Sequence, residues 1–181
     1  SLNHLEPADD LSKKVARPKN GQRARETPAG DLSVRVKELK AALGDQLIIL
    51  GHHYQRDEVI ALADYQGDSL ELARDAAQTD ARFIVFCGVH FMAETAAILS
   101  KPGQHVISPD PSAGCYLADT ASLEAVQAAW GLLGDALGNA EAEFTPLTYV
   151  NSSADLKAFC GRHGGLVCTS GNAENALRWA L

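Results

Sequence analysis

Hydrophobic and polar positions alternate between two patterns from residue 31 onward. Short apolar runs without alternation stand at 47–50, 82–88, 105–108, 146–150 and 165–169. Such runs are typical of strands that are covered on both faces of a sheet. Between the runs, apolar residues recur every three or four positions, which is typical of helices that pack on one side.

The helical pattern predicts seven helices, at 31–44, 57–66, 67–78, 92–100, 120–133, 153–163 and 172–181. Asp31 is a candidate N-cap and Gly44 a candidate C′ residue of the first helix. Asp68 and Glu71 have the spacing of a capping box at the start of the third. Strands that alternate with helices through short loops indicate βαβ units, so we expect an α/β fold with largely parallel sheets.

Composition and charge narrow the class of protein. Of the 181 residues, 46% are hydrophobic and 22% charged, as in ordinary globular proteins. The longest apolar run, at 83–89, is too short to span a bilayer, and the first residues lack the apolar region of a signal peptide. We therefore expect no membrane partner and a cytoplasmic protein.

The net charge of −7 is unevenly distributed. Residues 1–30 hold six basic and four acidic side chains, so the acidic excess lies in the rest of the chain. An acidic body argues against nucleic acid as a partner. Residues 1–30 are polar, aperiodic and interrupted by Pro and Gly, which predicts a disordered N-terminal arm.

The four cysteines include no C-x-x-C pair, and we expect them to be reduced thiols. Cys87 and Cys168 lie in predicted strands, where a cysteine packs as a small apolar residue. Cys160 lies on a predicted helix. Cys115 stands in a loop rich in Pro and Gly, so it alone has the context of a metal ligand or nucleophile.

Polar and proton-active side chains follow every predicted strand. In parallel sheets, functional groups gather beyond the carboxyl ends of the strands. Most of these loops lead into a helix N-terminus, which favours phosphate or carboxylate ligands. The loops occupy 51–54, 88–91, 109–115, 151–153 and 170–172.

The sequence "GHHY" at 51–54 has two interpretations, a polar surface loop or part of a functional site. His52 and His53 are adjacent, so in extended backbone they point to opposite sides and do not chelate one metal together. A substrate-binding or acid/base histidine with Tyr54 nearby is the alternative that we favour. Ser69 flanks a helix start, where capping and ligand binding are both open to it.

Several stretches together resemble the quinolinate synthase family. They are "IILGHHYQ", "ADYQGDSLELAR", "IVFCGVHFMAET", "DPSAGCYLAD", "YVNSSADLKA" and "VCTSGNA". The resemblance implies three α/β/α domains around a pseudo-threefold axis and a [4Fe–4S] cluster with one open iron. It further implies condensation of iminoaspartate with dihydroxyacetone phosphate to quinolinate, phosphate and water, a transferase step of NAD biosynthesis.

The resemblance also implies roles for individual residues. Cys115 matches a cluster ligand, and Tyr54 matches a tyrosine of proton transfer. The residues that match substrate contacts are His52, Ser69, Tyr149, Asn151 and Ser170, with His52 also a catalytic candidate. An aspartate-oxidising enzyme that supplies iminoaspartate is an implied partner.

The family's domain plan implies a first domain over 31–117 and part of a second over 118–181. We expect the other two cluster cysteines and a His/Glu loop to lie downstream, so this chain alone should not hold a normal cluster. Two rival interpretations stay open. One is a non-catalytic domain that binds phosphate or dicarboxylate, and the other is a phosphosugar enzyme of another doubly wound family that uses His52 and Tyr54.

Overall fold

A computed structural model describes residues 29–181. The predicted N-terminal arm at 1–30 therefore lies almost wholly outside the described residues. The first described element is helix α2 (Ala29–Leu43), followed by the short 3-10 helix η2 (Gly44–Gln46). The prediction of Asp31 as N-cap is wrong, because α2 already includes Ala29. Gly44 follows the helix with φ +52°, a conformation that glycine adopts without strain.

Four parallel strands form the first sheet in the order β2-β1-β3-β4. They are β1 (Leu47–His52), β2 (Tyr65–Gly67), β3 (Phe83–Cys87) and β4 (His105–Ile107). The central pair, β1 and β3, aligns Leu50 with Phe86, and both side chains are fully buried. This arrangement confirms the predicted α/β fold with a parallel sheet.

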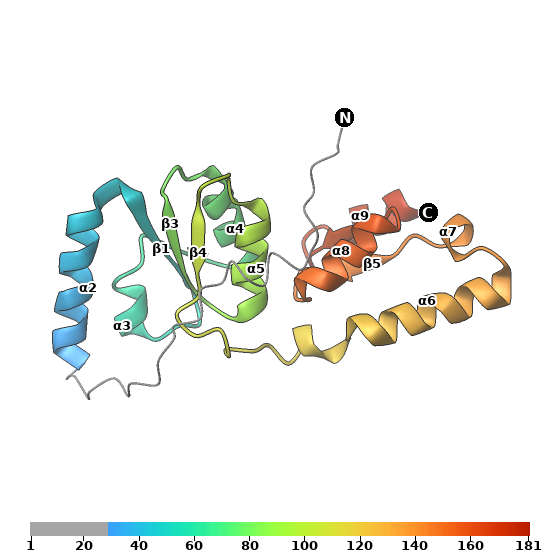
Figure 1. Ribbon diagram of the computed structural model, residues 1–181, viewed down its shortest axis with the longest axis horizontal. Coiled ribbons are helices and arrows are strands. Elements are labelled where there is room, and N and C mark those ends of the chain that lie inside the picture. Colours follow the sequence, from blue (N-terminus) through green and yellow to red (C-terminus); the bar gives the residue numbers. More distant parts are fainter. Residues whose placement is uncertain (1–28) are drawn as a thin grey trace.

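Helices cover both faces of this sheet, which gives the expected α/β/α layers (Figure 1). Helix α3 (Asp57–Ile60) lies with α2 on one side, and α4 (Ser69–Gln78) lies with α5 (His90–Leu99) on the other. Leu72 of α4 and Phe91 of α5 pack on the buried strand residues. The Asp68 carboxylate accepts the N–H of Leu70 and of Glu71, so the predicted N-cap of α4 is confirmed.

The helix predicted over 57–66 is wrong beyond Ile60. Helix α3 ends at that residue, and strand β2 begins at Tyr65. The Asp64 carboxylate accepts the backbone N–H of Ile49 at 2.8 Å and the Lys40 ammonium at 2.8 Å. These bonds hold the chain along the edge of β1, where Tyr65 pairs with Leu50.

The second half of the described chain builds a separate two-stranded parallel sheet from β5 (Leu147–Tyr149) and β6 (Leu166–Cys168). The 3-10 helix η3 (Ala118–Thr120) and the long helix α6 (Leu123–Leu137) lead into it. Helices α8 (Ala154–Arg162) and α9 (Ala173–Ala180) follow the two strands. Helix α7 (Ala140–Glu143) was not predicted; Asn139 caps it by accepting the Glu141 N–H.

Helix α6 is held to α8 by an aromatic cluster. The rings of Trp130 and Phe159 lie 5.7 Å apart in an edge-to-face arrangement. The His163 ring lies against both, and its Nδ1 is 2.9 Å from a Glu141 carboxylate oxygen. Among the described residues, no helix is long and apolar enough to cross a membrane.

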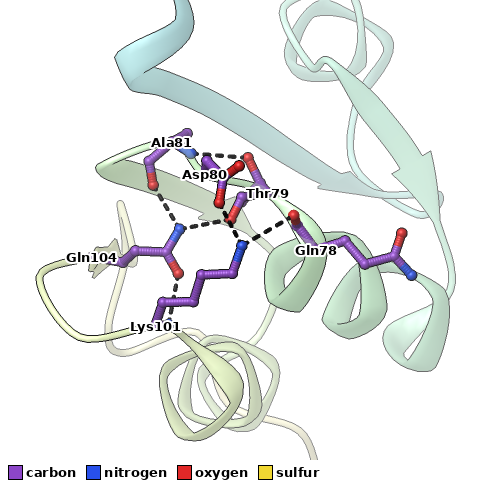
Figure 2. Close-up of polar contacts among 6 residues, drawn as sticks. All are labelled: Gln78, Thr79, Asp80, Ala81, Lys101 and Gln104. Atoms are coloured by element: carbon purple, nitrogen blue, oxygen red, sulfur yellow. Dashed lines mark hydrogen bonds and ion pairs between the residues drawn. The ribbon is translucent and has the colours of Figure 1, made fainter.

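Side-chain hydrogen bonds join the loops at the amino ends of the strands in the first sheet (Figure 2). The Gln104 amide donates to the carbonyls of Thr79 and Ala81 and accepts the backbone N–H of Lys101. The Lys101 ammonium also contacts Asp80 at 2.6 Å. These bonds join the loop before β3 to the loop before β4. Both loops lie at the amino ends of the strands, opposite the predicted site.

Candidate active site

His52 ends strand β1 and is buried, with 6% of its surface exposed. Burial, together with the charge of His53, lowers its pKa to about 4, and the charge of Asp68 opposes this shift. The backbone N–H of Tyr54 donates to His52 Nδ1 at 3.4 Å. His52 is therefore neutral near pH 7.

His53 does not point away from His52, so that expectation is wrong. The two ring centroids lie 4.2 Å apart, although His53 is exposed and His52 is buried. The reason is that the strand ends at His52 and the chain turns, with the Gln55 N–H bonded to the His52 carbonyl at 2.8 Å. Alternation of side chains holds only while the backbone stays extended.

Tyr54 contacts both His52, at the end of β1, and Met92, in the first turn of α5. Its ring centroid is 3.9 Å from that of His52, and its hydroxyl is 3.9 Å from Met92 Sδ. Burial raises the pKa of Tyr54. A backbone hydrogen bond from Val89 opposes this shift, and the Cys115 thiolate charge adds to it. The phenol therefore keeps its proton at neutral pH.

Ser69 is the first residue of α4, next to the His52 strand end. The Asp68 carboxylate already accepts two first-turn N–H groups there, at 2.8 Å and 2.9 Å. These bonds, chiefly the one from the Glu71 N–H, lower the pKa of Asp68. The Asp68 carboxylate thus places a negative charge at the N-terminus of α4. This charge weakens the attraction of the α4 dipole for an anionic ligand.

Cys115 lies on the loop after β4, half-buried against the core of the first sheet. The loop is tied to α5 because the His90 backbone N–H donates to the Ala113 carbonyl at 2.8 Å. The Asn151 amide lies 3.8 Å from Cys115 Sγ, within hydrogen-bond distance for sulfur. Residues 36 positions apart, one from each sheet, therefore meet at this thiol.

Tyr149 is the last residue of β5, and Ser170 lies two residues after β6. Their hydroxyl groups are 2.7 Å apart, and both side chains are exposed. Asn172, the N-cap of α9, turns its side-chain oxygen back to the Thr169 N–H and gives no capping bond to the helix. The first-turn N–H groups of α9, which begin three residues after Ser170, therefore do not donate to the Asn172 side chain.

A cavity of about 390 Å³ opens beside the second sheet, with Tyr149, Asn151 and Ser152 in its wall. A larger cavity of about 960 Å³ lies at the amino-end edge and is lined by Lys40, Asp64 and Arg82 among others. It contains none of the predicted site residues. The smaller cavity includes two of the predicted site residues, Tyr149 and Asn151, and lies beyond the carboxyl end of β5, where functional groups of parallel sheets gather.

The predicted residues thus form three contacting groups. His52 stacks on Tyr54, Cys115 meets Asn151, and Tyr149 bonds Ser170. Ser69 lies beside the first group through the pairing of Gly67 with His52. Sequence reasoning missed Met92, Glu94 and Lys157, because their contacts depend on how helices pack and no motif spacing marks them.

The described residues fit one ligand of an iron–sulfur cluster and not a whole ligand set. Cys115 is a partly buried thiol on a loop, as cluster ligands are. Within residues 29–181, no three His, Cys, Asp or Glu side chains gather as metal ligands. We therefore derive no reaction step through a cluster.

Comparison with known proteins identifies the family. The family model for quinolinate synthetase A protein matches residues 34–181. The quinolinate synthase of Nocardioides sp. is 62% identical over 157 residues, which are 85% of this chain and 39% of that protein. The quinolinate synthase of Herpetosiphon aurantiacus is 56% identical over 150 residues, 83% of this chain and 40% of that protein.

The quinolinate synthase of Streptomyces coelicolor is 57% identical over 152 residues, 83% of this chain and 38% of that protein. The chain thus spans about two-fifths of the length of these curated relatives. The matched region includes every candidate residue of the site. The chain therefore belongs to the quinolinate synthetase A family.

Proposed function

We propose that the protein encoded by the complete gene is a quinolinate synthase, which condenses iminoaspartate with dihydroxyacetone phosphate to quinolinate, phosphate and water. The relatives' names support the activity. The observation that carries the proposal is the contact of Cys115 with Asn151 between the two sheets. This contact supports a single site in which the His52–Tyr54 pair and the Tyr149–Ser170 pair act together.

His52 acts in this proposal as a neutral hydrogen-bond donor. Its Nδ1 accepts the Tyr54 backbone N–H, so the ring proton resides on Nε2. Nε2–H can then donate to a carboxylate or phosphate oxygen of a substrate. A cationic role is disfavoured because burial lowers the pKa of His52 to about 4.

Tyr54 acts as a proton donor. Its pKa is raised, chiefly by burial, so the hydroxyl is protonated when substrate arrives. From Oη it can protonate a hydroxyl group that leaves as water, and a nearby water or the substrate's own acidic carbon can return the proton. General acid catalysis of this kind contributes about 10²–10⁴-fold to the rate.

Anionic groups of the substrates bind at the second sheet. Tyr149 and Ser170 offer two adjacent hydroxyls, and the start of α9 offers backbone N–H groups. A helix N-terminus of this kind favours phosphate and carboxylate ligands. Asn151 contributes an amide beside them, and Ser69 a hydroxyl at the first sheet.

Cys115 supplies one thiolate ligand of the [4Fe–4S] cluster in this proposal. When bound, a cluster with an open iron supplies Lewis-acid chemistry at a substrate hydroxyl or carboxylate. The proposed domain division follows the two sheets, with a first domain over 31–117 and part of a second over 118–181. The junction stands directly after Cys115.

A pair of tyrosine variants tests the proposal. Tyr54 and Tyr65 are each 50% exposed, but only Tyr54 belongs to the site. We expect Tyr54→Phe to lower kcat for quinolinate formation by about 10²–10⁴-fold, since it removes the proton donor. Tyr65→Phe, the matched control, should leave kcat unchanged. The assay follows quinolinate from dihydroxyacetone phosphate and iminoaspartate generated in situ.

Two outcomes would contradict the proposal. Equal kcat in Tyr54→Phe and the parent protein would remove Tyr54 from proton transfer. A protein that binds phosphate or dicarboxylate yet makes no quinolinate would favour the rival interpretation of a non-catalytic binding domain. Calorimetric titration with inorganic phosphate and with malate distinguishes that case from a misfolded preparation.

A further inference from the structure

Glu94 lies beside the site, yet the mechanism above does not use it. It belongs to α5 of the first sheet, and its side chain is 26% exposed. Its Oε2 accepts the backbone N–H of Ala154 at 3.0 Å. Ala154 is the first residue of α8, which belongs to the second sheet. One carboxylate therefore links helices of the two sheets.

The bond adds to the capping of α8. The first N–H groups of a helix have no partner within the helix and need an acceptor from elsewhere. The Ser153 hydroxyl, in the N-cap position, accepts the Leu156 N–H at 3.3 Å. The Ala154 N–H is accepted by Glu94 instead, and a negative charge at this end of the helix is favourable.

A second contact lies one turn further along α8 and one turn earlier along α5. The Lys157 ammonium donates to the Ser152 carbonyl and lies 5.4 Å from the centre of the Phe91 ring. Burial lowers the pKa of Lys157 to about 8, and the Glu94 charge opposes that shift. Because Phe91 and Glu94 are three residues apart on α5, one face of that helix makes both contacts.

Helix α5 also holds the loop that carries Cys115. The His90 backbone N–H, at the start of α5, donates to the Ala113 carbonyl at 2.8 Å. On the other side, Asn151 stands three residues before Ala154 and reaches Cys115 Sγ at 3.8 Å. Helix α5 is thus tied both to the cysteine loop and to the helix that follows Asn151.

We propose that Glu94 is a positioning residue, which sets the Asn151 loop against the Cys115 thiol by capping α8 from the other sheet. The effect on turnover rests on the proposed function, but the effect on the thiol does not. The rival is that Glu94 only pairs with His90, whose Nε2 lies 3.4 Å from Glu94 Oε1. His90→Gln removes that pair and leaves the backbone bond to Ala113 in place.

The test is the alkylation rate of each cysteine by iodoacetamide, read by peptide mass mapping. It uses the protein as expressed, reduced and freed of metal by chelation. We expect Glu94→Ala to raise the rate at Cys115 severalfold, because the Asn151 loop no longer covers the thiol. The rate at Cys160, buried in α8, should stay unchanged and reports unfolding in the same sample.

Two matched variants separate positioning from charge. Glu94→Gln keeps an oxygen that can accept the Ala154 N–H, so its Cys115 rate should return close to that of the parent. His90→Gln should match the parent. The proposal is overturned if Glu94→Ala leaves the Cys115 rate unchanged, if Gln behaves like Ala, or if Cys160 reacts faster in parallel.

Turnover gives the second readout. Glu94→Ala should lower kcat for quinolinate more than it raises KM, and Glu94→Gln should recover most of the kcat. A parent protein that makes no quinolinate would refute the proposed function. The alkylation rates would still decide the role of Glu94 in that case.

Discussion

At the scale of single residues, His52 connects burial to pH dependence. Its pKa is about 4 in the folded protein, chiefly because of burial, against 6.5 for an exposed histidine. Between these pH values the unfolded chain binds a proton at this side chain and the folded chain does not. Stability is therefore full above about pH 6.5 and falls as the pH drops toward 4.

The expected loss is on the order of 3 kcal/mol, at about 1.36 kcal/mol per pKa unit. Urea unfolding at about pH 7 and about pH 4.5 measures it. His52→Gln, which cannot titrate, should lose less stability over the same interval by about this amount. An identical pH dependence in the variant and the parent would show that His52 titrates normally in the folded protein.

Which site residues could be predicted depends on whether local sequence determines their place. His52, Tyr54 and Cys115 became candidates because each lies in a loop that follows a predicted strand, where functional groups of parallel sheets gather. The contact between the His52 and His53 rings was not, because it arises from a turn that ends the alternation. Glu94 was not predicted, because its partner lies 60 residues away on another sheet.

At the scale of elements, Gly165 allows the close approach of the loop before β6 to β5. A Cβ at this position would overlap the Pro146 carbonyl group. That carbonyl accepts the Leu166 N–H at 3.3 Å, so backbone atoms cannot move aside without loss of the pairing. The second sheet therefore depends on this glycine.

We expect Gly165→Ala to lower the free energy of unfolding by about 1–3 kcal/mol, the usual cost of overpacking. Gly134→Ala is the matched control, because Gly134 lies in α6 with no atom within 4 Å of its added Cβ. It should be stabilising by about 0.5–1 kcal/mol through helix propensity. Equal unfolding midpoints for the two variants would refute the close-approach argument.

Gln104 and Lys101 allow a comparison of two kinds of bond at the amino-end edge (Figure 2). Gln104→Ala leaves two part-buried carbonyls without their donor, and we expect a cost of about 1–3 kcal/mol. Lys101→Gln removes an exposed ion pair with Asp80, and we expect a smaller loss of stability than for Gln104→Ala, because water screens the pair. Denaturant midpoints measure both, and a larger effect for Lys101→Gln would reverse the assignment.

Elements marked by an apolar run or by a helical period were predicted, and two short elements without either pattern were missed. The strand at 47–50 and the helix at 67–78 correspond to β1 and α4, with bounds shifted by a few residues. β2 and α7 contain three and four residues, which is too short for a period to show. Their positions are determined by single bonds, such as that from the Ile49 N–H to Asp64.

At the scale of the whole molecule, the site is assembled from two sheets. The α/β class and the parallel strands were predicted from the alternation of elements. The placement of one sheet against the other was not, since it depends on contacts between α5 and α8 that no periodicity encodes. The proposed activity depends on this placement, because it brings Asn151 to Cys115.

We propose that Cys115 holds a cluster at this junction in the protein that the complete gene encodes. The most direct measurement is the iron and acid-labile sulfide content of anaerobically purified protein, with Cys160→Ala as the control variant. We predict that the parent and Cys160→Ala hold iron and sulfide together, and that Cys115→Ser loses both along with quinolinate formation. If Cys115→Ser keeps the iron and sulfide content of the parent, Cys115 does not hold the cluster.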